Sequence, residues 1–306
     1  MQQNKKGIII KGVGGLYYVR PDNGDDELIP CRARGKFRHE GMTPLAGDSV
    51  LLTVDKDAVI DRIVDRKNAL IRPPLANLDI LFVCMASAFP SPILLSVDKL
   101  ISIAEYHGIE PVIVVGKSEL DERSTETICE IYRRAGFEVF ALSAKSGDGV
   151  DAIIQYLKTH MCGKIAAFAG ASGVGKSTLL SRLFPEREIE TGEISLKIER
   201  GKNTTRHVEL FDYPCDGGMG YIADTPGFSL LDFVRFDFFG KDDLPSTMRE
   251  FRPHLGACRY KKCTHTKEDG CAILEAVKNG EIAPSRHESF LDMYEALKNK
   301  HEWQKG

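Results

Sequence analysis

The residues whose chemistry is clearest form one run, 170–178, which we call the phosphate loop. The run reads Gly170, Ala171, Ser172, Gly173, Val174, Gly175, Lys176, Ser177 and Thr178. It fits the pattern G-x-x-x-x-G-K-[ST], in which glycines let the backbone curl and point its N–H groups at phosphate oxygens. Lys176 is expected to reach the β- and γ-phosphates of a nucleotide, and Ser177 is expected to bind Mg²⁺.

The sequence on either side of the phosphate loop supports this interpretation. An apolar run, 164–169, leads into the loop, and residues 178–183 continue with helical character. The motif therefore stands between a predicted strand and a predicted helix, which is the context that it requires. A glycine-rich turn that fits the pattern by chance is the alternative, but the flanking elements favour nucleotide binding.

A second group of chemically distinctive residues lies near the C-terminus. Its members are Cys258, Cys263, His265 and Cys271, spaced C-x₄-C-x-H-x₅-C. Three thiolates and one imidazole suit tetrahedral Zn²⁺, and four ligands leave no open position, so the spacing predicts one structural zinc ion. Unpaired cysteines with a surface histidine are the alternative. Basic residues and a tyrosine between the ligands suit contact with RNA.

Two shorter loops each follow an apolar run. The first, which we call the base loop, is Gly116, Lys117, Ser118 and Glu119, and the second base loop is Ser143, Ala144 and Lys145. Ligands of open α/β sheets bind at the carboxyl ends of the strands, where both loops are expected to lie. They resemble the guanine-reading Asn-Lys-x-Asp and Ser-Ala-Lys loops of GTPases.

The elements that must position these loops alternate between strands and helices. Buried strands are expected at 78–85, 111–115 and 138–142, and helices at 94–106, 124–135 and 150–158. This alternation predicts a doubly wound α/β sheet.

The N-terminal part has a different pattern. Short β-prone runs at 7–11, 16–19, 28–32, 50–54 and 59–64 are separated by turn sequences. Five strands in this length predict a small barrel of the oligonucleotide-binding (OB) type, with an SH3-like barrel as the rival.

One stretch of this N-terminal part, 32–38, carries a basic residue at every second position. If extended, it would present these residues on one face and could bind RNA phosphates, with Tyr17, Tyr18 or Phe37 available for stacking. A solvated strand face is the equal alternative.

Three domains are therefore expected. They are an OB-like, RNA-binding barrel at 1–72, a nucleotide-binding domain at 75–235 after a proline-rich linker, and a zinc-binding C-terminal domain at 236–306. Amphipathic helices at 272–278 and 285–297 are expected to pack the last domain onto the body.

The order of the motifs is unusual. In an ordinary GTPase the base-reading loops follow the phosphate loop, whereas here they precede it. After the phosphate loop, Thr204 and Thr205 resemble the threonine pair of switch I, and residues 224–227 resemble switch II. The order predicts a circularly permuted GTPase domain whose former ends are joined at 159–164.

The permuted order, the N-terminal barrel, the cysteine cluster and the stretch 200–207 together resemble one family. It is the RsgA (YjeQ) family of GTPases that depend on the small ribosomal subunit, and the resemblance spans nearly the whole chain. It implies an enzyme that hydrolyses GTP during late maturation of that subunit, with its rRNA and GTP or GDP as partners.

The resemblance also implies roles for residues. Ser177 and Thr205 would bind Mg²⁺, Asp224 would reach it through water, and the Gly227 N–H would face the γ-phosphate. On the base side, Lys117 would lie along the purine, Glu119 would accept the guanine N–H groups, and the Ala144 N–H would donate to the guanine O6.

Three positions depart from the pattern of GTPases. Gly116 replaces an asparagine and Glu119 an aspartate, which weakens the case for strict guanine selectivity. Phe228 stands where many GTPases carry a glutamine that orients water, so intrinsic hydrolysis should be slow. His207 is a candidate to supply the missing polar group, and a solvated histidine is the alternative.

Composition limits the remaining possibilities. The chain has 306 residues, a net charge of −3 and no apolar run near the ~20 residues of a membrane helix. Its cysteines outside the cluster are scattered, which is typical of a reducing compartment. We expect a cytoplasmic monomer with no membrane contact. The rival to the GTPase is a zinc-bearing RNA-binding protein that only senses nucleotide.

Overall fold

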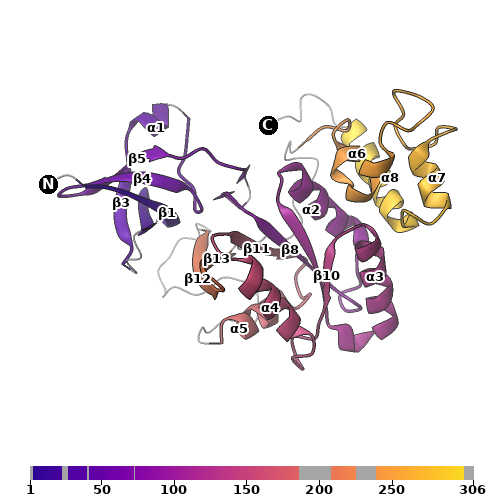
Figure 1. The fold of residues 1–306 in the computed structure, drawn as a ribbon, viewed down its shortest axis with the longest axis horizontal. Coiled ribbons are helices and arrows are strands. Elements are labelled where there is room, and N and C mark those ends of the chain that lie inside the picture. Colours follow the sequence, from indigo (N-terminus) through magenta and orange to yellow (C-terminus); the bar gives the residue numbers. More distant parts are fainter. Residues whose placement is uncertain are drawn as a thin grey trace. The chain divides into compact units, whose positions relative to one another are not determined.

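A computed structural model gives the structure of this chain (Figure 1). It describes residues 3–22, 27–39, 41–71, 73–185, 208–224 and 239–299. The chain forms two compact units. The first, which we call the barrel unit, comprises Met1–Ile80, Gln155–Phe168 and Arg187–Phe228. The second, which we call the pocket unit, comprises Leu81–Ile154, Ala169–Glu186 and Ser229–Gly306.

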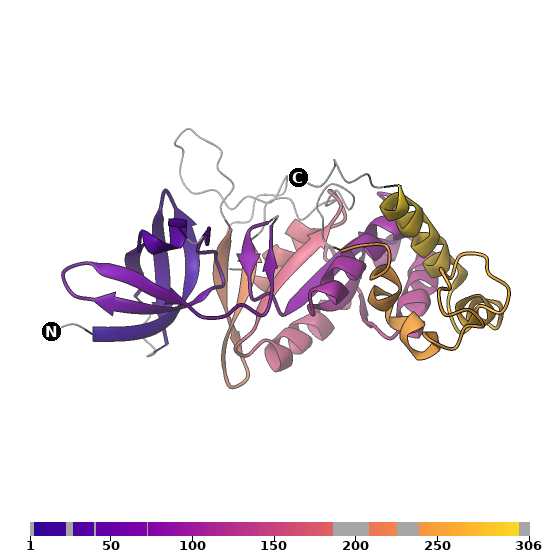
Figure 2. The same cartoon turned by 90° about the horizontal axis from the view of Figure 1, so that it is seen from above.

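Five strands of the barrel unit close into a ring (Figures 1 and 2). They are β1 (Gln3–Val13), β2 (Leu16–Pro21), β3 (Ile29–Ala33), β4 (Ser49–Val54) and β5 (Ala58–Ile63). Strand β1 pairs with both β2 and β4, β2 pairs with β3, and β5 pairs with both β3 and β4. Closure leaves no free sheet edge, which is how small barrels avoid edge-to-edge pairing. The predicted five-stranded, OB-like barrel is confirmed.

Residues 32–38, the basic stretch of the barrel unit, do not form the single extended strand considered above, because Phe37 enters the barrel core. Strand β3 ends at Ala33, and a short helix, α1 (Lys36–His39), follows. The Phe37 side chain is only 4% exposed and belongs to the same buried core as Ile9 and Leu52. The expectation that residues 32–38 form one extended face, with Phe37 free to stack, is therefore wrong. Burying an aromatic ring is worth about 1.5–3 kcal/mol, which outweighs continuing an exposed strand.

Three further strands begin in the barrel unit. Strand β11 (Ile165–Gly170) runs parallel to β13 (Gly218–Asp224), and β12 (Glu209–Cys215) forms an antiparallel hairpin with β13. Strand β12 also pairs with β1, where the Lys11 amino group binds the Glu209 carboxylate at 2.8 Å. The unit also contains the short strands β6 (Ala69–Leu70) and β7 (Leu75–Ala76).

The pocket unit contains the alternating part of the chain. Strands β8 (Ile80–Ala86), β9 (Glu110–Gly116) and β10 (Glu138–Ala141) are neighbours in one sheet, and β9 and β10 run parallel. The helices are α2 (Leu94–Tyr106), α3 (Glu122–Arg134) and α5 (Lys176–Leu183), with the short 3₁₀ helix η1 (Ser118–Leu120). Helix α4 (Val150–His160) begins in this unit, and its residues from Gln155 on belong to the barrel unit. Every side chain of β8 is buried, as expected for a central parallel strand. The predicted alternation is confirmed.

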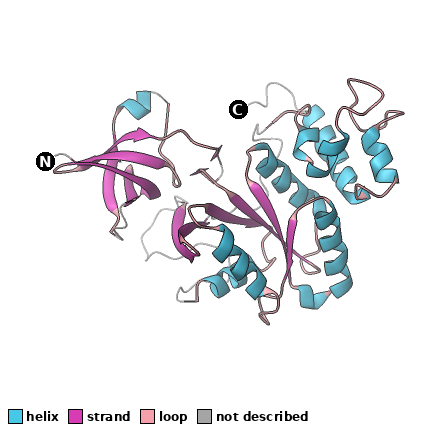
Figure 3. Ribbon diagram, in the orientation of Figure 1, coloured by secondary structure: helices cyan, strands magenta, loops and turns pink. Residues whose placement is uncertain are grey.

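The last described residues, 239–299, contain no strand and are mostly helical (Figure 3). Their elements are α6 (Leu244–Thr247), η2 (Arg249–His254), α7 (Ala272–Lys278) and α8 (Pro284–Lys298). Phe251, Phe290 and Met293 share a core with Ile103 of α2. These helices therefore belong to the same compact body as the alternating strands and helices. Among the described helices, none is long and apolar enough to cross a membrane.

A buried ionic cluster reinforces this packing. The Arg286 guanidinium of α8 is 1% exposed, binds the Glu250 carboxylate at 2.6 Å and also donates to Asp98 of α2. The Tyr132 hydroxyl of α3 donates to the same Asp98 oxygen at 2.9 Å. Burial raises the pKa of Asp98, while Arg286 opposes that shift. Removing one partner of such a cluster leaves a buried charge uncompensated, at a cost of about 3–5 kcal/mol.

Candidate functional site

A cavity of about 350 Å³ lies in the pocket unit, at the carboxyl ends of β8, β9 and β10. Its lining comprises Cys84, Met85, Val114, Gly116, Lys117, Glu119, Leu120, Leu142, Ala144, Lys145, Val174, Gly175, Lys176, Thr178 and Leu179. The volume falls within the range of small-molecule sites. Residues from the phosphate loop and from both base loops therefore face one cavity.

The phosphate loop has a shape that requires glycine. Gly170, Gly173 and Gly175 adopt φ values of +142°, +78° and +104°, which disfavour other residues. A Cβ at Gly170 would lie 2.1 Å from the carbonyl oxygen of Cys84 in β8. Helix α5 begins at Lys176, so its first N–H groups have no partner within the helix. The loop and helix start thus form an anion-binding concavity.

Lys176 is held within this concavity. Its amino group donates to the carbonyl oxygens of Gly170 at 2.8 Å and Ala171 at 2.7 Å. Burial lowers the pKa of Lys176, and the neighbouring Cys84 opposes the shift. Phosphate oxygens would bind this cation more strongly than two neutral carbonyls, because the hydrogen bonds would join opposite charges.

The base loop lies against the phosphate loop. A Cβ at Gly116 would lie 2.9 Å from the carbonyl oxygen of Val174, closer than Cβ atoms normally approach. Lys117 adopts a left-handed conformation, with φ +57°, and its amino group donates to the Phe89 carbonyl. The Ser87 hydroxyl donates to the Lys117 carbonyl at 2.7 Å, which fixes the loop from behind.

The second base loop is tied to helix α5. The Arg182 guanidinium donates to the carbonyl oxygens of Ala144 at 3.1 Å and Lys145 at 2.8 Å. Ser143 is buried, and its hydroxyl accepts from the Ser146 N–H at 3.3 Å, so it supports the loop. Hydrogen bonds therefore fix the second base loop to the helix that begins at the phosphate loop.

The structure brings together most of the predicted nucleotide-binding positions. Gly116, Lys117, Glu119, Ala144, Lys145, Val174, Gly175, Lys176 and Thr178 line the cavity. Ser118, Ser143, Gly170, Ala171, Ser172, Gly173 and Ser177 belong to the same loops without being among its lining residues. Asp224 is the last residue of β13 in the barrel unit. Thr205, His207, Gly227 and Phe228 lie outside the described residues.

Sequence reasoning missed the apolar wall and the arginine of this site. Met85, Val114 and Leu142 line the cavity from the ends of the parallel strands or just beyond them. Their place at the end of each apolar run is a signal that could have identified them. Arg182 gave no comparable signal, because its role depends on a loop 37 residues earlier in the chain.

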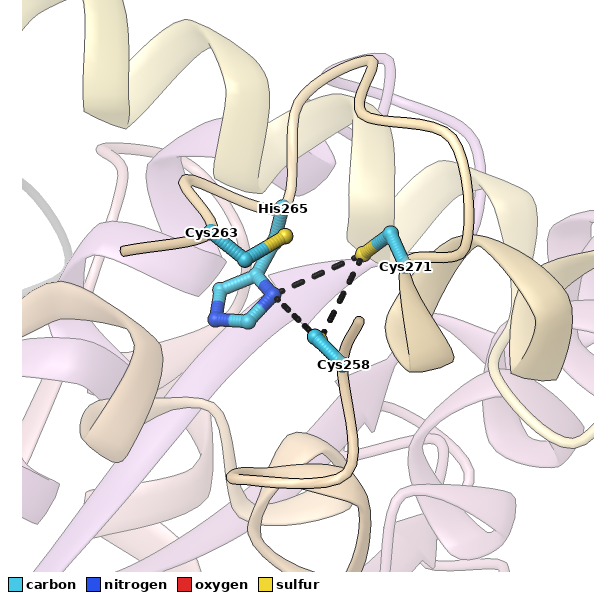
Figure 4. Close-up of side chains that lie close together, drawn as sticks. All are labelled: Cys258, Cys263, His265 and Cys271. Atoms are coloured by element: carbon cyan, nitrogen blue, oxygen red, sulfur yellow. Dashed lines mark hydrogen bonds between the residues drawn. The ribbon is translucent and has the colours of Figure 1, made fainter. Parts of the chain in front are cut away.

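The four predicted metal ligands meet in space (Figure 4). One ligand atom from each of Cys258, Cys263, His265 and Cys271 lies within 4.8 Å of the others. The Nδ1 atom of His265 is 3.6 Å from the Cys258 sulfur and 3.5 Å from the Cys271 sulfur. The cluster can therefore hold one metal ion of tetrahedral preference. Burial raises the pKa of Cys263 to about 12, and a bound cation would stabilise the thiolate.

Two residues that sequence reasoning missed shape this cluster. The Glu268 carboxylate accepts from the N–H groups of Thr264 at 2.7 Å and Thr266 at 3.0 Å, on either side of His265. Burial opposes ionisation of Glu268, but bonds from Thr264 and neighbouring N–H groups hold its pKa at about 2. The His287 Nε2 lies 2.9 Å from the His265 carbonyl oxygen, to which it can donate. His265 is thereby held with φ +60°, an unusual value for a residue other than glycine.

A cavity shared by a phosphate loop and two base loops that precede it along the chain defines a circularly permuted GTPase. Comparison with solved structures agrees. The crystal structure of YjeQ from Thermotoga maritima matches with a TM-score of 0.81 and 30% identity, covering 98% of this chain and 100% of that one. The structure described as "YloQ, a circularly permuted GTPase" matches with a TM-score of 0.78 and 33% identity, covering 98% and 96%.

Sequence comparison makes the assignment narrower. The RsgA GTPase family matches residues 63–234, and the RsgA N-terminal domain matches residues 6–60. A protein of Ruminiclostridium cellulolyticum named "Small ribosomal subunit biogenesis GTPase RsgA" is 38% identical, over 96% of this chain and 94% of its own. The protein of the same name in Halalkalibacterium halodurans is 40% identical, over 97% and 98%. The chain belongs to the RsgA GTPase family, whose members are GTP hydrolases.

Proposed function

We propose that this chain binds the small ribosomal subunit, hydrolyses GTP there during late maturation of the subunit, and then leaves. The observation that most strongly supports this proposal is the cavity, which is lined by residues of the phosphate loop and of both base loops. It occurs in a chain whose full-length relatives are named for biogenesis of that subunit. The proposal includes a cytoplasmic location and a monomeric state.

On the phosphate side, the N–H groups of Gly173 to Ser177 surround the β- and γ-phosphates. Lys176 exchanges its two carbonyl partners for phosphate oxygens and neutralises charge that grows during hydrolysis. The Ser177 hydroxyl would bind Mg²⁺, which would neutralise charge on the phosphates. Roles in holding Mg²⁺ for Thr205 and, through water, for Asp224, and a γ-phosphate contact for the Gly227 N–H, are proposed from family membership alone.

On the base side, three residues read the guanine. Lys117 lays its methylene stem along the purine face. Glu119 accepts the N1–H and N2–H₂ groups, and the Ala144 N–H donates to O6. All three residues line the cavity, which supports these roles.

We further propose that Cys258, Cys263, His265 and Cys271 bind one structural Zn²⁺. Three cysteine sulfurs and one histidine nitrogen lie within 4.8 Å of one another, and zinc prefers such ligands. The purified protein should contain about one zinc ion per chain. Cys263→Ser should lose the ion and weaken subunit binding while nucleotide affinity persists. Cys162→Ser, an exposed cysteine outside the cluster, is the control. A full zinc content in Cys263→Ser would contradict the assignment.

Contact with rRNA is proposed for two exposed basic regions. In the barrel unit, Arg32, Arg34 and Lys36 are exposed, although Arg34 also pairs with Asp61. In the pocket unit, Arg259 lies over the ring of Tyr260, whose side chain is 49% exposed. A cation and an exposed ring suit stacking on unpaired bases.

The test of the main proposal is GTP turnover with and without small ribosomal subunits, with large subunits as the control. Small subunits should raise the rate by roughly 10²-fold or more, as partners do for GTPases whose own water positioning is incomplete. Large subunits should leave it unchanged. A rate that saturating small subunits do not alter would favour a nucleotide-sensing RNA-binding protein instead.

A further inference from the structure

Two cysteines outside the metal cluster lie side by side in the barrel unit. Cys162 is exposed in the turn between α4 and β11, and Cys215 is the half-buried last residue of β12. The two side chains form a hydrogen bond with each other. Both sulfurs also lie against Gly218. The Cys215 thiol donates to its carbonyl at 3.4 Å, and a Cβ built on it would be 3.2 Å from the Cys162 sulfur.

The backbones that carry these thiols are fixed to each other by three hydrogen bonds. The Asp216 N–H donates to the Lys158 carbonyl at 2.8 Å, and the Gly163 N–H donates to the Met219 carbonyl at 2.9 Å. The Tyr221 N–H donates to the Lys164 carbonyl at 2.9 Å. A disulfide forms without strain only where two backbones already lie close. Here hydrogen bonds of adjacent residues hold the two backbones together, and the two thiols already contact each other.

The other cysteines are less suited to oxidation. Cys31, Cys84 and Cys129 are buried, and burial raises the pKa of each thiol, to about 12 for Cys31 and Cys84. Burial also keeps oxidants from these three sulfurs, so they should be inert. Burial and the neighbouring Cys162 raise the pKa of Cys215 too, but Cys215 is only half-buried and lies against the exposed Cys162, which is therefore the first thiol to react. The remaining cysteines belong to the metal cluster. Cys162 and Cys215 are thus the accessible pair outside that cluster.

We propose that Cys162 and Cys215 are a redox modification site that forms a reversible intramolecular disulfide on exposure to hydrogen peroxide. The Cys162 thiolate attacks one peroxide oxygen, the O–O bond breaks, and hydroxide leaves and is protonated to water. The Cys215 thiol gives up its proton as its sulfur attacks the sulfenic sulfur of Cys162, the S–O bond breaks, and the leaving hydroxide takes up that proton to form a second water. The two sulfurs together lose two electrons, which reduce the peroxide. A dithiol reductant reverses the reaction by thiol–disulfide exchange.

The position of the disulfide gives it a structural consequence. It would join the turn before β11 to the hairpin of β12 and β13, whose second strand ends at Asp224. The chain between the two cysteines contains the whole phosphate loop. Oxidation would therefore place the phosphate loop inside a covalently closed ring. Closing a chain loop of this kind constrains the unfolded state, so the oxidised protein should unfold at a higher temperature.

The test is peptide mapping of the full chain, purified with its metal, after mild treatment with hydrogen peroxide and alkylation of the remaining thiols. We expect a cross-linked peptide pair containing Cys162 and Cys215, lighter by two hydrogens, which dithiothreitol converts back to two alkylatable thiols. Cys162→Ser and Cys215→Ser should each abolish the pair, and Cys129→Ser should retain it. The unfolding midpoint should rise on oxidation in the wild type and in Cys129→Ser only.

Three results would overturn the proposal. One is Cys162 recovered as sulfinic or sulfonic acid while Cys215 remains alkylatable. Another is a disulfide that joins Cys162 of one chain to a second copy. The third is both thiols fully alkylatable after peroxide treatment that oxidises free cysteine in the same tube.

Discussion

The two sides of the nucleotide cavity are built differently. The phosphate side comes from one continuous loop, in which Gly170, Gly175, Lys176 and Ser177 fit every fixed position of the pattern. The base side comes from two loops that precede it along the chain, and the base loop departs from the GTPase pattern at Gly116 and Glu119. Phosphate recognition uses backbone N–H groups, which most substitutions preserve. Base recognition uses side chains, which substitutions remove or change. The base side is therefore where departures from the GTPase pattern are expected.

The two sides nevertheless touch. The absence of a side chain at Gly116 lets the Val174 carbonyl of the phosphate loop approach to a distance that leaves no room for a Cβ. An asparagine would have joined the loops through its side chain. Here direct backbone packing replaces that connection. The base loop therefore packs directly against the phosphate loop. A substitution in the base loop should change the conformation of the phosphate loop.

The largest expected effect tests the phosphate side. Lys176→Ala removes the cation proposed to neutralise charge developing at the phosphates, so the GTP hydrolysis rate should fall by about 10²–10³-fold. The unfolding midpoint should change little, because within the described part of the chain the Lys176 amino group bonds to carbonyls of its own loop. Lys241→Ala, at an exposed lysine outside the cavity, should keep full activity. Hydrolysis at the wild-type rate in Lys176→Ala would mean that the phosphate side lies elsewhere.

Much of the fold could be predicted from local sequence. The helices at 94–106 and 272–278 begin and end at the predicted residues. Their apolar spacing is periodic, and periodicity is a local property. Strand β12 could not be predicted, because Asp212 and Pro214 disfavour a strand. Asp212 is accommodated because the Arg20 guanidinium of β2 binds it at 2.6 Å. That partner lies 192 residues away, and no local pattern reveals it.

The site residues also fall into those that a local motif predicts and those that depend on distant partners. The phosphate loop and the clustering of the four candidate metal ligands were predictable, since each is a short motif with fixed spacing. Arg182, Glu268 and His287 were not, because each acts by holding the backbone of another residue. The expected stacking role of Phe37 was wrong because its ring enters the barrel core instead of solvent. The roles of Thr205 and Gly227 and the three domain boundaries stay predictions.

An intermediate effect tests the base side. Glu119→Ala removes the carboxylate proposed to accept guanine N–H groups, a charged contact that would be worth on the order of 1.5–3 kcal/mol. The preference for GDP over ADP should therefore fall by about 10–100-fold, at 1.4 kcal/mol per decade. Competition titrations against labelled GDP measure this preference. Glu122→Ala, an exposed glutamate three residues on and outside the cavity, is the matched control.

Competition titrations on the wild-type protein measure how strongly the base side prefers guanine over adenine. Glu119 has one more methylene than the usual aspartate, and Gly116 offers no amide. Guanine should remain preferred over adenine by roughly 10- to 1000-fold, since the carboxylate contact outweighs one lost neutral hydrogen bond. Equal affinity for ATP and GTP would remove the guanine assignment while leaving the phosphate side intact.

The smallest expected effect tests the contact between the two sides. Gly116→Ala adds a Cβ that would lie 2.9 Å from the Val174 carbonyl and 3.6 Å from the Met85 carbonyl. The phosphate loop must then shift, at a cost of about 1 kcal/mol, the lower end for overpacked sites. Affinity for GDP and for GTP should fall together, by about 3- to 10-fold. Because the loss acts through the phosphate loop, ATP affinity should fall by the same factor, which separates this effect from that of Glu119→Ala.

Gly35→Ala is the control, since a Cβ at Gly35 would meet nothing within 4 Å. Gly116→Asn carries the same Cβ together with the amide that other GTPases use. The difference between the asparagine and alanine variants therefore measures the amide alone, about 0.5–1.5 kcal/mol for one neutral hydrogen bond. If Gly116→Ala binds every nucleotide as tightly as the wild type, the base loop relaxes freely. The two sides of the cavity are then independent, and the missing side chain at position 116 has no structural cause in the phosphate loop.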